Sequence, residues 1–253
     1  MKQKNLLEKG IDVLEKLKEI DSLSFVELQR ELSIPKTTLY RILKTLIEKN
    51  FVIYQGKKYK LGYSFLSYTK KILSEIQLRE ITSPYLKELC EKTGETIELI
   101  IPYNDEILYI DKIESPQSIK LVAQIGSKYQ TLHASAPGKI LLAYDNNVFK
   151  NFIKRKKLEK ITQRTITDKK RLRKEIEKIK KTGWAYDIGE ARIDVVRVAG
   201  PIFNYEKKLI GIISIAGPYY RMKLEKIKEF AEILKKICNE ISEKIGYEKE
   251  VFK

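Results

Sequence analysis

Histidine and cysteine are scarce in this chain of 253 residues, which has one His and two Cys. Zinc sites are usually built from three or four His and Cys side chains at short, regular spacings. His133, Cys90 and Cys238 have no such spacing, so we expect no metal and no other cofactor. Two cysteines are also too few for the disulfide framework of a small secreted domain.

Long hydrophobic runs are absent as well. No apolar stretch reaches the 18 or more residues that a membrane-spanning helix needs. Residues 1–21 are charged throughout and lack the apolar centre of a signal peptide. We therefore expect a cytoplasmic protein without a membrane partner.

Sequence patterns of common enzymes are missing too. There is no G-x-S-x-G and no G-x-x-x-x-G-K-[ST] pattern. His133 could in principle join Ser135 or Ser214 and Asp187 in a triad, but no serine lies on a nucleophile elbow. We interpret His133 as structural, read Gly138 and Lys139 as helix-start residues, and expect no enzyme. A small-acid hydrolase or isomerase is the least favoured alternative.

Positive charge is abundant, with a formal net charge of +16. Such an excess favours a polyanionic partner. Residues 1–62 carry a net +5 and residues 150–181 a net +11, whereas the other segments nearly cancel. We predict two basic helices in 150–181, with a solvated face as the favoured interpretation. Contact with flanking DNA or with another subunit's acidic surface is the alternative.

The N-terminal segment has the pattern of a helix-turn-helix. Apolar residues at helical spacing predict a helix over 5–20, and Ser24 with Glu27 is a capping box that opens a second helix. Pro35 suits the first turn of a third helix, which runs to about Lys49. One stripe of this third helix is apolar, and the opposite side carries Thr37, Arg41, Lys44 and Thr45, with Lys36 and Tyr40 at the margin.

A basic hairpin follows this helix directly. Residues 51–54 and 59–61 are strand-like, and Gly56 supplies the turn between them. An Arg side chain can donate two hydrogen bonds to a guanine base, while Thr and Lys side chains can donate hydrogen bonds to phosphate oxygens. We therefore predict a winged helix with these DNA-contacting residues: Lys36, Thr37, Thr38, Tyr40, Arg41, Lys44, Lys57, Lys58 and Lys60.

Residues 63–80 lack Gly and Pro and are predicted to form a connecting helix. We expect a partner subunit or, alternatively, the chain's own domain to cover its apolar residues, Phe65, Leu66, Tyr68, Ile72, Leu73 and Ile76. The strands flanked by helices in the rest of the chain predict an α+β sensor-type domain. Its expected helices are 84–93, 136–144 and 222–246, and its expected strands are 96–102, 106–113, 118–125, 195–203 and 209–218.

Six stretches, in order, resemble the IclR family of transcriptional regulators: "SIPKTTLYRILKTL", "YKLG", "LHASAPGKILLA", "GWAYDIGE", "VAGPIF" and "IGIISIAGP". The resemblance covers nearly the whole chain. It implies a winged helix-turn-helix domain (1–62), a linker helix (63–80) and a GAF-like effector-binding domain (81–253). It also implies dimers or dimers of dimers on operator DNA.

In similar proteins a small carboxylate or aromatic acid lodges in the C-terminal domain. The positions that match this pocket are Leu121, Ser135, Ala136, Asp187, Val195, Arg197, Ser214 and Ala216. The resemblance thus implies a sequence-specific regulator, expected to be a repressor, with an organic acid as effector. A ligand-independent architectural DNA-binding protein is the main alternative.

Two residues depart from the family pattern, Asp194 in place of a common Gly and Arg197 in place of a small residue. Arg197 could clamp a carboxylate, or pair with Asp187 or Asp194 and fill the pocket. Strand alternation also allows Val196 and Val198 to form the core face, with Arg197 pointing away.

Overall fold

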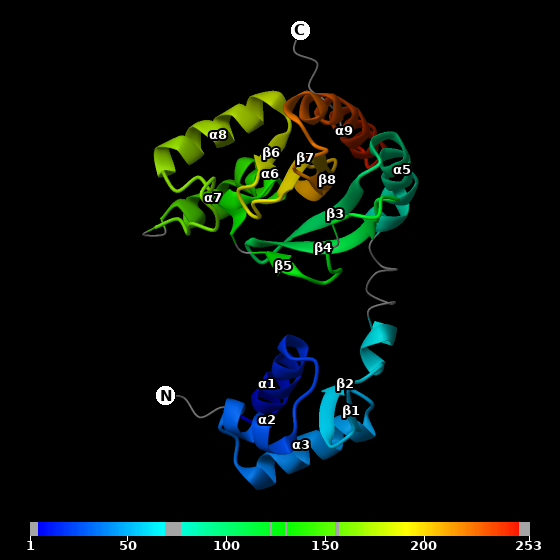
Figure 1. Cartoon of the computed structure of the whole chain (residues 1–253), viewed down its shortest axis with the longest axis vertical. Helices are drawn as coiled ribbons and strands as arrows, with labels where there is room; N and C mark the ends of the chain where they lie inside the picture. The colour runs from blue at the N-terminus through cyan, green and yellow to red at the C-terminus, as the bar shows by residue number, and fades with distance from the viewer. Residues whose placement is uncertain (1–4, 69–76, 122, 130, 155–156, 248–253) are drawn as a thin grey trace. The chain divides into compact units, whose positions relative to one another are not determined.

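The computed structural model describes residues 5–68, 77–121, 123–129, 131–154 and 157–247. The chain divides into two compact units, residues 1–75 and 76–253, which we call the N-terminal and C-terminal units (Figure 1). The linker residues Ile72, Leu73 and Ile76 lie outside the described residues, as do all of 69–76 within the predicted linker helix. The division at 62/63 and 80/81 therefore stays a prediction.

Three helices and a hairpin form the N-terminal unit: α1 (Leu6–Glu19), α2 (Phe25–Leu32), α3 (Lys36–Glu48), β1 (Val52–Gln55) and β2 (Lys58–Leu61). An isolated bridge between Leu23 and Tyr59 ties the α1–α2 connection to the hairpin. The helices and β1 enclose one core, which includes Val13, Leu28, Leu39, Leu43 and Val52. A further helical segment follows at 64–68.

Local signals place the helix ends of this unit. The predicted capping box of α2 is confirmed, because the Ser24 amide donates to Glu27 Oε2 at 2.7 Å and the Glu27 amide donates to Ser24 Oγ at 3.3 Å. Ser33 adopts the left-handed conformation and ends α2. Pro35 is the N-cap of α3, one residue before the first turn in which we had placed it.

Gly62 explains the end of the "YKLG" stretch. Here the chain leaves β2 and crosses the backbone that follows α3, and the Gly62 amide donates to the Phe51 carbonyl at 2.8 Å. A Cβ atom at this position would lie 2.1 Å from the Asn50 carbonyl oxygen. Only glycine allows so close a crossing.

The C-terminal unit is a six-stranded antiparallel sheet with helices on both faces (Figure 1). The strand order is β5-β4-β3-β8-β7-β6, with β3 (Thr96–Tyr103), β4 (Glu106–Ile113), β5 (Lys128–Tyr129), β6 (Ala185–Ile188), β7 (Val195–Phe203) and β8 (Leu209–Pro218). One face packs against α5 (Gln77–Thr93) and α9 (Leu224–Lys244). The other packs against α6 (Ala136–Tyr144), which contacts α7 (Asn146–Ile153), α8 (Lys169–Thr182) and the short helix η1 (Leu132–Ala134).

Strand alternation decides which way Arg197 faces. A Cβ at Gly200 would contact Cys238 and Leu234 of α9, so the even positions of β7, including Val196 and Val198, face α9. Ala199 belongs to the core that includes Ile140 of α6. Arg197, two residues before Ala199, therefore lies on the α6 face.

Two predicted elements of this unit need correction, and one strand was missed. The described residues of 118–125, all but 122, form no strand, because the Thr96 hydroxyl donates to the Leu121 carbonyl at 2.9 Å, and Ile119 stays exposed. The helix predicted over 84–93 begins at Gln77 and contains Pro84, since its buried stripe, which includes Leu78 and Thr82, extends upstream of the proline. Strand β6 was not predicted.

The overall prediction is confirmed: the protein is α+β, with an N-terminal helix-turn-helix and a C-terminal sheet domain. Within the described part of the chain, no helix has both the length and the apolar character required to cross a membrane.

Candidate functional site

The outward face of α3 carries most of the side chains predicted to contact DNA. Leu39, Ile42 and Leu43 are buried. The exposed side is formed by Lys36, Thr37, Tyr40, Arg41, Lys44 and Thr45, while Thr38 is half-buried. The two faces expected from the sequence are therefore both present.

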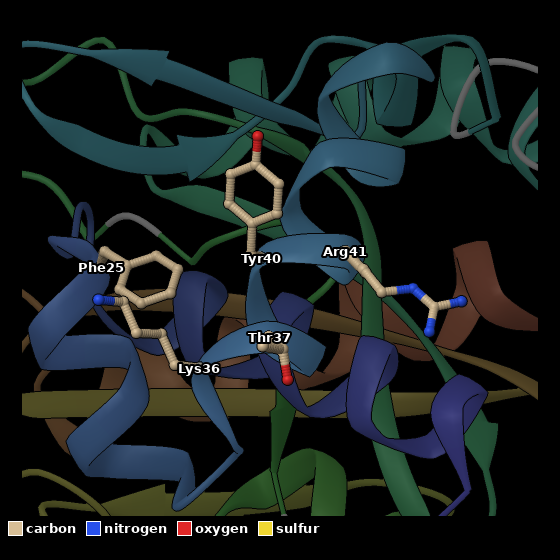
Figure 2. Close-up of a pocket in the computed structure, with 5 residues that line it drawn as sticks. All are labelled: Phe25, Lys36, Thr37, Tyr40 and Arg41. Carbon is tan, nitrogen blue, oxygen red and sulfur yellow. The ribbon is translucent and has the colours of Figure 1, made fainter.

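An open depression of about 550 Å³ lies between α2 and α3 and is lined by Phe25, Lys36, Thr37, Tyr40 and Arg41. Figure 2 shows Tyr40 and Arg41 extending in different directions from α3, with Phe25 contributed by α2. The Arg41 side chain has no ion-pair or hydrogen-bond partner among the described residues, since the hydrogen bond from the Thr45 hydroxyl goes to the Arg41 backbone carbonyl. A guanidinium in this state keeps all its donors available for a partner molecule.

The wing is a minimal hairpin. Its turn consists of Gly56 and Lys57, both with positive φ (60° and 61°), as a two-residue hairpin turn requires. Lys57 and Lys58 are exposed. Lys60 is half-buried, and its Nζ donates to Gln55 Oε1 at 2.8 Å, so it is less available than the other two.

The second basic segment lies mostly on α8. Leu172, Ile176 and Ile179 face the core, and the opposite side exposes Lys170, Lys174, Lys178 and Lys181. Two of its cations lie over aromatic rings, Arg173 over Phe149 at 5.5 Å and Lys178 over Tyr186 at 5.3 Å. This geometry agrees with a solvated basic face, and the alternative of a DNA or subunit contact stays open.

A cavity of about 270 Å³ opens on the α6 face of the sheet, where β7 begins. Its lining includes Tyr109, Ala123, Tyr129, Ser135, Arg192 and Arg197. Of the predicted effector residues, Ser135 and Arg197 line the cavity directly. Five of the others are buried: Ala136, Asp187, Val195, Ser214 and Ala216. Leu121 is half-buried, and its carbonyl accepts a hydrogen bond from the Thr96 hydroxyl.

Arg197 pairs with a residue that we did not predict. Its Nε donates to Glu98 Oε2 at 3.4 Å, and the Glu98 side chain is fully buried on β3. Strand β8 lies between β7 and β3, with Ala216 opposite Arg197 and Ser214 opposite Glu98. The small side chains of Ser214 and Ala216 leave the room that Arg197 needs to reach across the strand.

The partners that we had considered for Arg197 are engaged elsewhere. Asp194 accepts from Arg192 at 3.0 Å on the surface. Asp187 lies opposite Arg197 on β6, but its Oδ2 accepts from the Ala136 amide at 2.9 Å. Burial raises the pKa of Asp187, against the opposing charge of Arg197.

The "SAPGK" stretch is the tightly packed start of α6. Ser135 is the N-cap, and its Oγ accepts from the Gly138 amide at 3.2 Å. A Cβ on Gly138 would lie 2.3 Å from the Leu132 carbonyl oxygen. Asp187 adds a carboxylate at the same helix start, where negative charge is favourable. The reading of Gly138 and Lys139 as helix-start residues is thus confirmed.

Lys139 has a second role that we did not predict. It is fully buried, and its Nζ contacts Glu190 Oε1 at 2.6 Å and the Tyr186 carbonyl at 3.1 Å. Burial outweighs the attraction of Lys139 and raises the pKa of Glu190 to about 7. The Thr165 hydroxyl also donates to the Glu190 backbone carbonyl, at 2.7 Å. Together these contacts fix the loop that contributes Ala191 and Arg192 to the cavity wall.

His133 has a structural environment. Its ring is buried, bonds through Nε2 with the Glu159 carbonyl at 2.8 Å, and packs against Phe152. These contacts match the structural role that we assigned to it.

A helix-turn-helix with a basic hairpin, in one chain with a separate sheet domain that contains a cavity, is the architecture of a DNA-binding transcriptional regulator with a C-terminal ligand-binding domain. Residues 6–56 match the IclR helix-turn-helix domain, and residues 70–243 match the C-terminal domain of bacterial IclR transcriptional regulators. The chain belongs to the IclR family of transcriptional regulators.

Individual relatives agree with this assignment. The chain is 30% identical to the HTH-type transcriptional regulator KipR of Bacillus subtilis over 228 residues, 89% of this chain and 91% of that protein. The crystal structure of Thermotoga maritima IclR matches with a TM-score of 0.79 and 34% identity, covering 95% of this chain and 98% of that one. An IclR homologue from Microbacterium hydrocarbonoxydans, complexed with 4-hydroxybenzoate, has the same fold (TM-score 0.83, 18% identity, 95% and 99% coverage).

Proposed function

We propose that this protein is a sequence-specific repressor whose affinity for operator DNA changes when a small carboxylate occupies the cavity beside Arg197. The observation that carries the proposal is the exposed face of α3, on which Thr37, Arg41 and Lys44 lie opposite a closed apolar core. Arg41 is our candidate for reading a guanine in the major groove, and Lys57 and Lys58 of the wing would contact phosphates.

A homodimer, or a dimer of dimers, would present two or more of these helices to repeated half-sites. Apolar side chains that stay exposed in the N-terminal unit support such an assembly. They include Leu7 and Ile11 of α1 and Leu66 in the segment that follows the hairpin. Exposed apolar patches of this kind favour a protein partner.

The effector half of the proposal rests on Arg197. Of the guanidinium nitrogens, only Nε has a hydrogen-bond partner among the described residues, even though as little as 12% of the Arg197 side chain is exposed. The two terminal nitrogens are therefore available for a carboxylate at the cavity. The 4-hydroxybenzoate named for the Microbacterium homologue is an acid of this class. A ligand that binds one arrangement of the protein better would shift its population and thereby its affinity for DNA.

The DNA half is tested by recovering bound genomic fragments with the purified protein and measuring their affinity for variants. Arg41→Ala should weaken binding by about 1–3 kcal/mol and relax the preference at one base pair. Arg30→Ala is the matched control, since Arg30 is exposed on α2 outside the depression. Unchanged affinity and preference for Arg41→Ala would contradict the assignment.

The repressor role is tested by transcription in vitro from a promoter that carries the recovered site. Added protein should lower transcript yield, and Arg41→Ala should restore it. Higher yield with added protein would make the regulator an activator.

A further inference from the structure

Buried oxygen atoms without hydrogen-bond donors surround Arg197. Three of them, Glu98 Oε1, Asp187 Oδ1 and Ser214 Oγ, have no partner among the residues that the structure describes. Buried acceptors are normally satisfied, so a group of unsatisfied ones around Arg197, which itself lines the cavity, points to a missing donor.

These atoms belong to three of the four neighbouring strands β3-β8-β7-β6, on one face of the sheet. Glu98 on β3 lies opposite Ser214 on β8, and Asp187 on β6 lies opposite Arg197 on β7. Neighbouring strands are separated by roughly 4.8 Å. The three oxygens therefore flank one guanidinium within the width of four strands, and Arg197 extends across that width to Glu98.

The charges of this cluster do not match a simple acid. Two buried carboxyl groups, Glu98 and Asp187, flank the guanidinium of Arg197, and the other cation that acts on Asp187, the buried Lys139, already pairs with Glu190. The nearby cation Arg192 is exposed and pairs with Asp194. A ligand with only a carboxylate would add a third acidic group beside one guanidinium, and buried charge without compensation is unfavourable.

A ligand that carries both a carboxylate and an ammonium group resolves both problems. Its carboxylate can accept from the free terminal nitrogens of Arg197. Its ammonium has three N–H donors and no acceptor, which suits the unsatisfied oxygens of Glu98 and Asp187. It also adds no net charge to the cluster.

We propose that the effector of this protein is a small α-amino acid, with its carboxylate on Arg197 and its ammonium group on Glu98 and Asp187. The inference rests on the proposed function, because it takes the same cavity as the effector site. The cavity, at about 270 Å³, is small, and the rings of Tyr109 and Tyr129 form part of its wall. These walls suit a compact side chain with apolar or aromatic character.

The first experiment is a thermal-shift screen of the full-length protein with the twenty common amino acids, followed by calorimetry on those that stabilise it. Each binder is then compared with two analogues of the same carbon skeleton. One has hydrogen and the other a hydroxyl group in place of the ammonium. We expect the amino acid to bind at least about tenfold more tightly than either analogue, since removal of the ammonium leaves buried carboxylates unpaired.

Glu98→Gln provides the matched variant. It keeps the size of the side chain but removes the charge that would hold the ammonium. The affinity for the amino acid should fall about tenfold or more, whereas the affinity for the deaminated acid should stay equal or rise. A merely structural role of Glu98 would lower both affinities together. The ligand series on the unmodified protein decides the question even if this variant fails to fold.

Other outcomes would overturn the inference. If the deaminated acid binds as tightly as the amino acid, the cavity is a plain carboxylate site, and the proposed function stands without this refinement. If the hydroxy acid binds best, the missing donor is a hydroxyl group. If no amino acid stabilises the protein, the inference fails, and the Arg41→Ala measurement still tests the DNA-binding half independently.

Discussion

We predict that the buried pair of Lys139 and Glu190 makes the stability of the C-terminal unit depend on pH. Lys139 is a fully buried residue of α6, and its Nζ lies 2.6 Å from Glu190 Oε1. The second oxygen, Glu190 Oε2, is buried without a partner among the described residues. Burial therefore opposes ionisation more strongly than Lys139 favours it, and Asp187 and Glu175 add repulsion. The perturbation that tests this reasoning is Glu190→Gln.

The magnitude follows from the shift of the pKa from 4.5 to about 7. A difference of roughly 2.5 units between the unfolded and folded states corresponds to about 3 kcal/mol. Because the folded pKa is the higher one, the folded state holds a proton that the unfolded state has lost between these values. The stability from this group is thus complete below pH 4.5 and is lost as the pH rises through about 7.

Glutamine imitates the protonated carboxyl group at every pH, because its amide oxygen can still accept from Lys139. The variant should match the unmodified protein at about pH 5 and exceed its free energy of unfolding by about 3 kcal/mol at about pH 8. The difference between the two proteins cancels groups that titrate alike in both.

Urea unfolding monitored by tryptophan fluorescence gives the required quantity. Trp184, the one tryptophan in the sequence, precedes β6 in the C-terminal unit and packs near Tyr186, so the signal reports on the unit that contains the pair. A variant less stable than the unmodified protein at about pH 8 would refute the reasoning. It would mean that the ion pair gains more from Coulomb attraction than it loses by desolvation.

Two further predictions concern backbone and charge. Gly138→Ala should destabilise the C-terminal unit by about 3 kcal/mol, because the new Cβ would lie 2.3 Å from the Leu132 carbonyl oxygen; an unchanged melting curve would show that the α6 start can shift freely. Replacing both Lys57 and Lys58 by alanine should weaken binding to all DNA sequences and reduce the slope of log K against log salt by about 2; an unchanged slope would remove the wing from the DNA interface.

The helix-turn-helix could be predicted from the sequence because its signals are local. The capping box of Ser24 and Glu27 spans one helical turn, and the two faces of α3 are set by the period of the helix itself. A segment of fewer than 60 residues thus contains both the core and the exposed face of this unit.

The cavity could be predicted only in part, because its chemistry depends on residues that are distant in sequence. Glu98 and Arg197 are 99 positions apart, and their contact exists only because β8 inserts between β3 and β7. Lys139 looked like an ordinary helix-start residue. It is buried because α6 is covered on all sides, and all residues from Ala136 to Ala143 are buried. No periodicity of the α6 sequence distinguishes a helix that is covered all round from one with a single core face.

The Arg197–Glu98 pair also explains why a departure from a family pattern is hard to interpret on its own. An arginine alone at the cavity would be a cation that calls for an anionic ligand. With Glu98 behind it and Asp187 beside it, the same arginine is part of a cluster that already holds more acid than base. The sign of the charge that a ligand must supply is therefore set by the cluster as a whole, and the two carboxyl groups turn an apparent anion site into a site for a ligand with both charges.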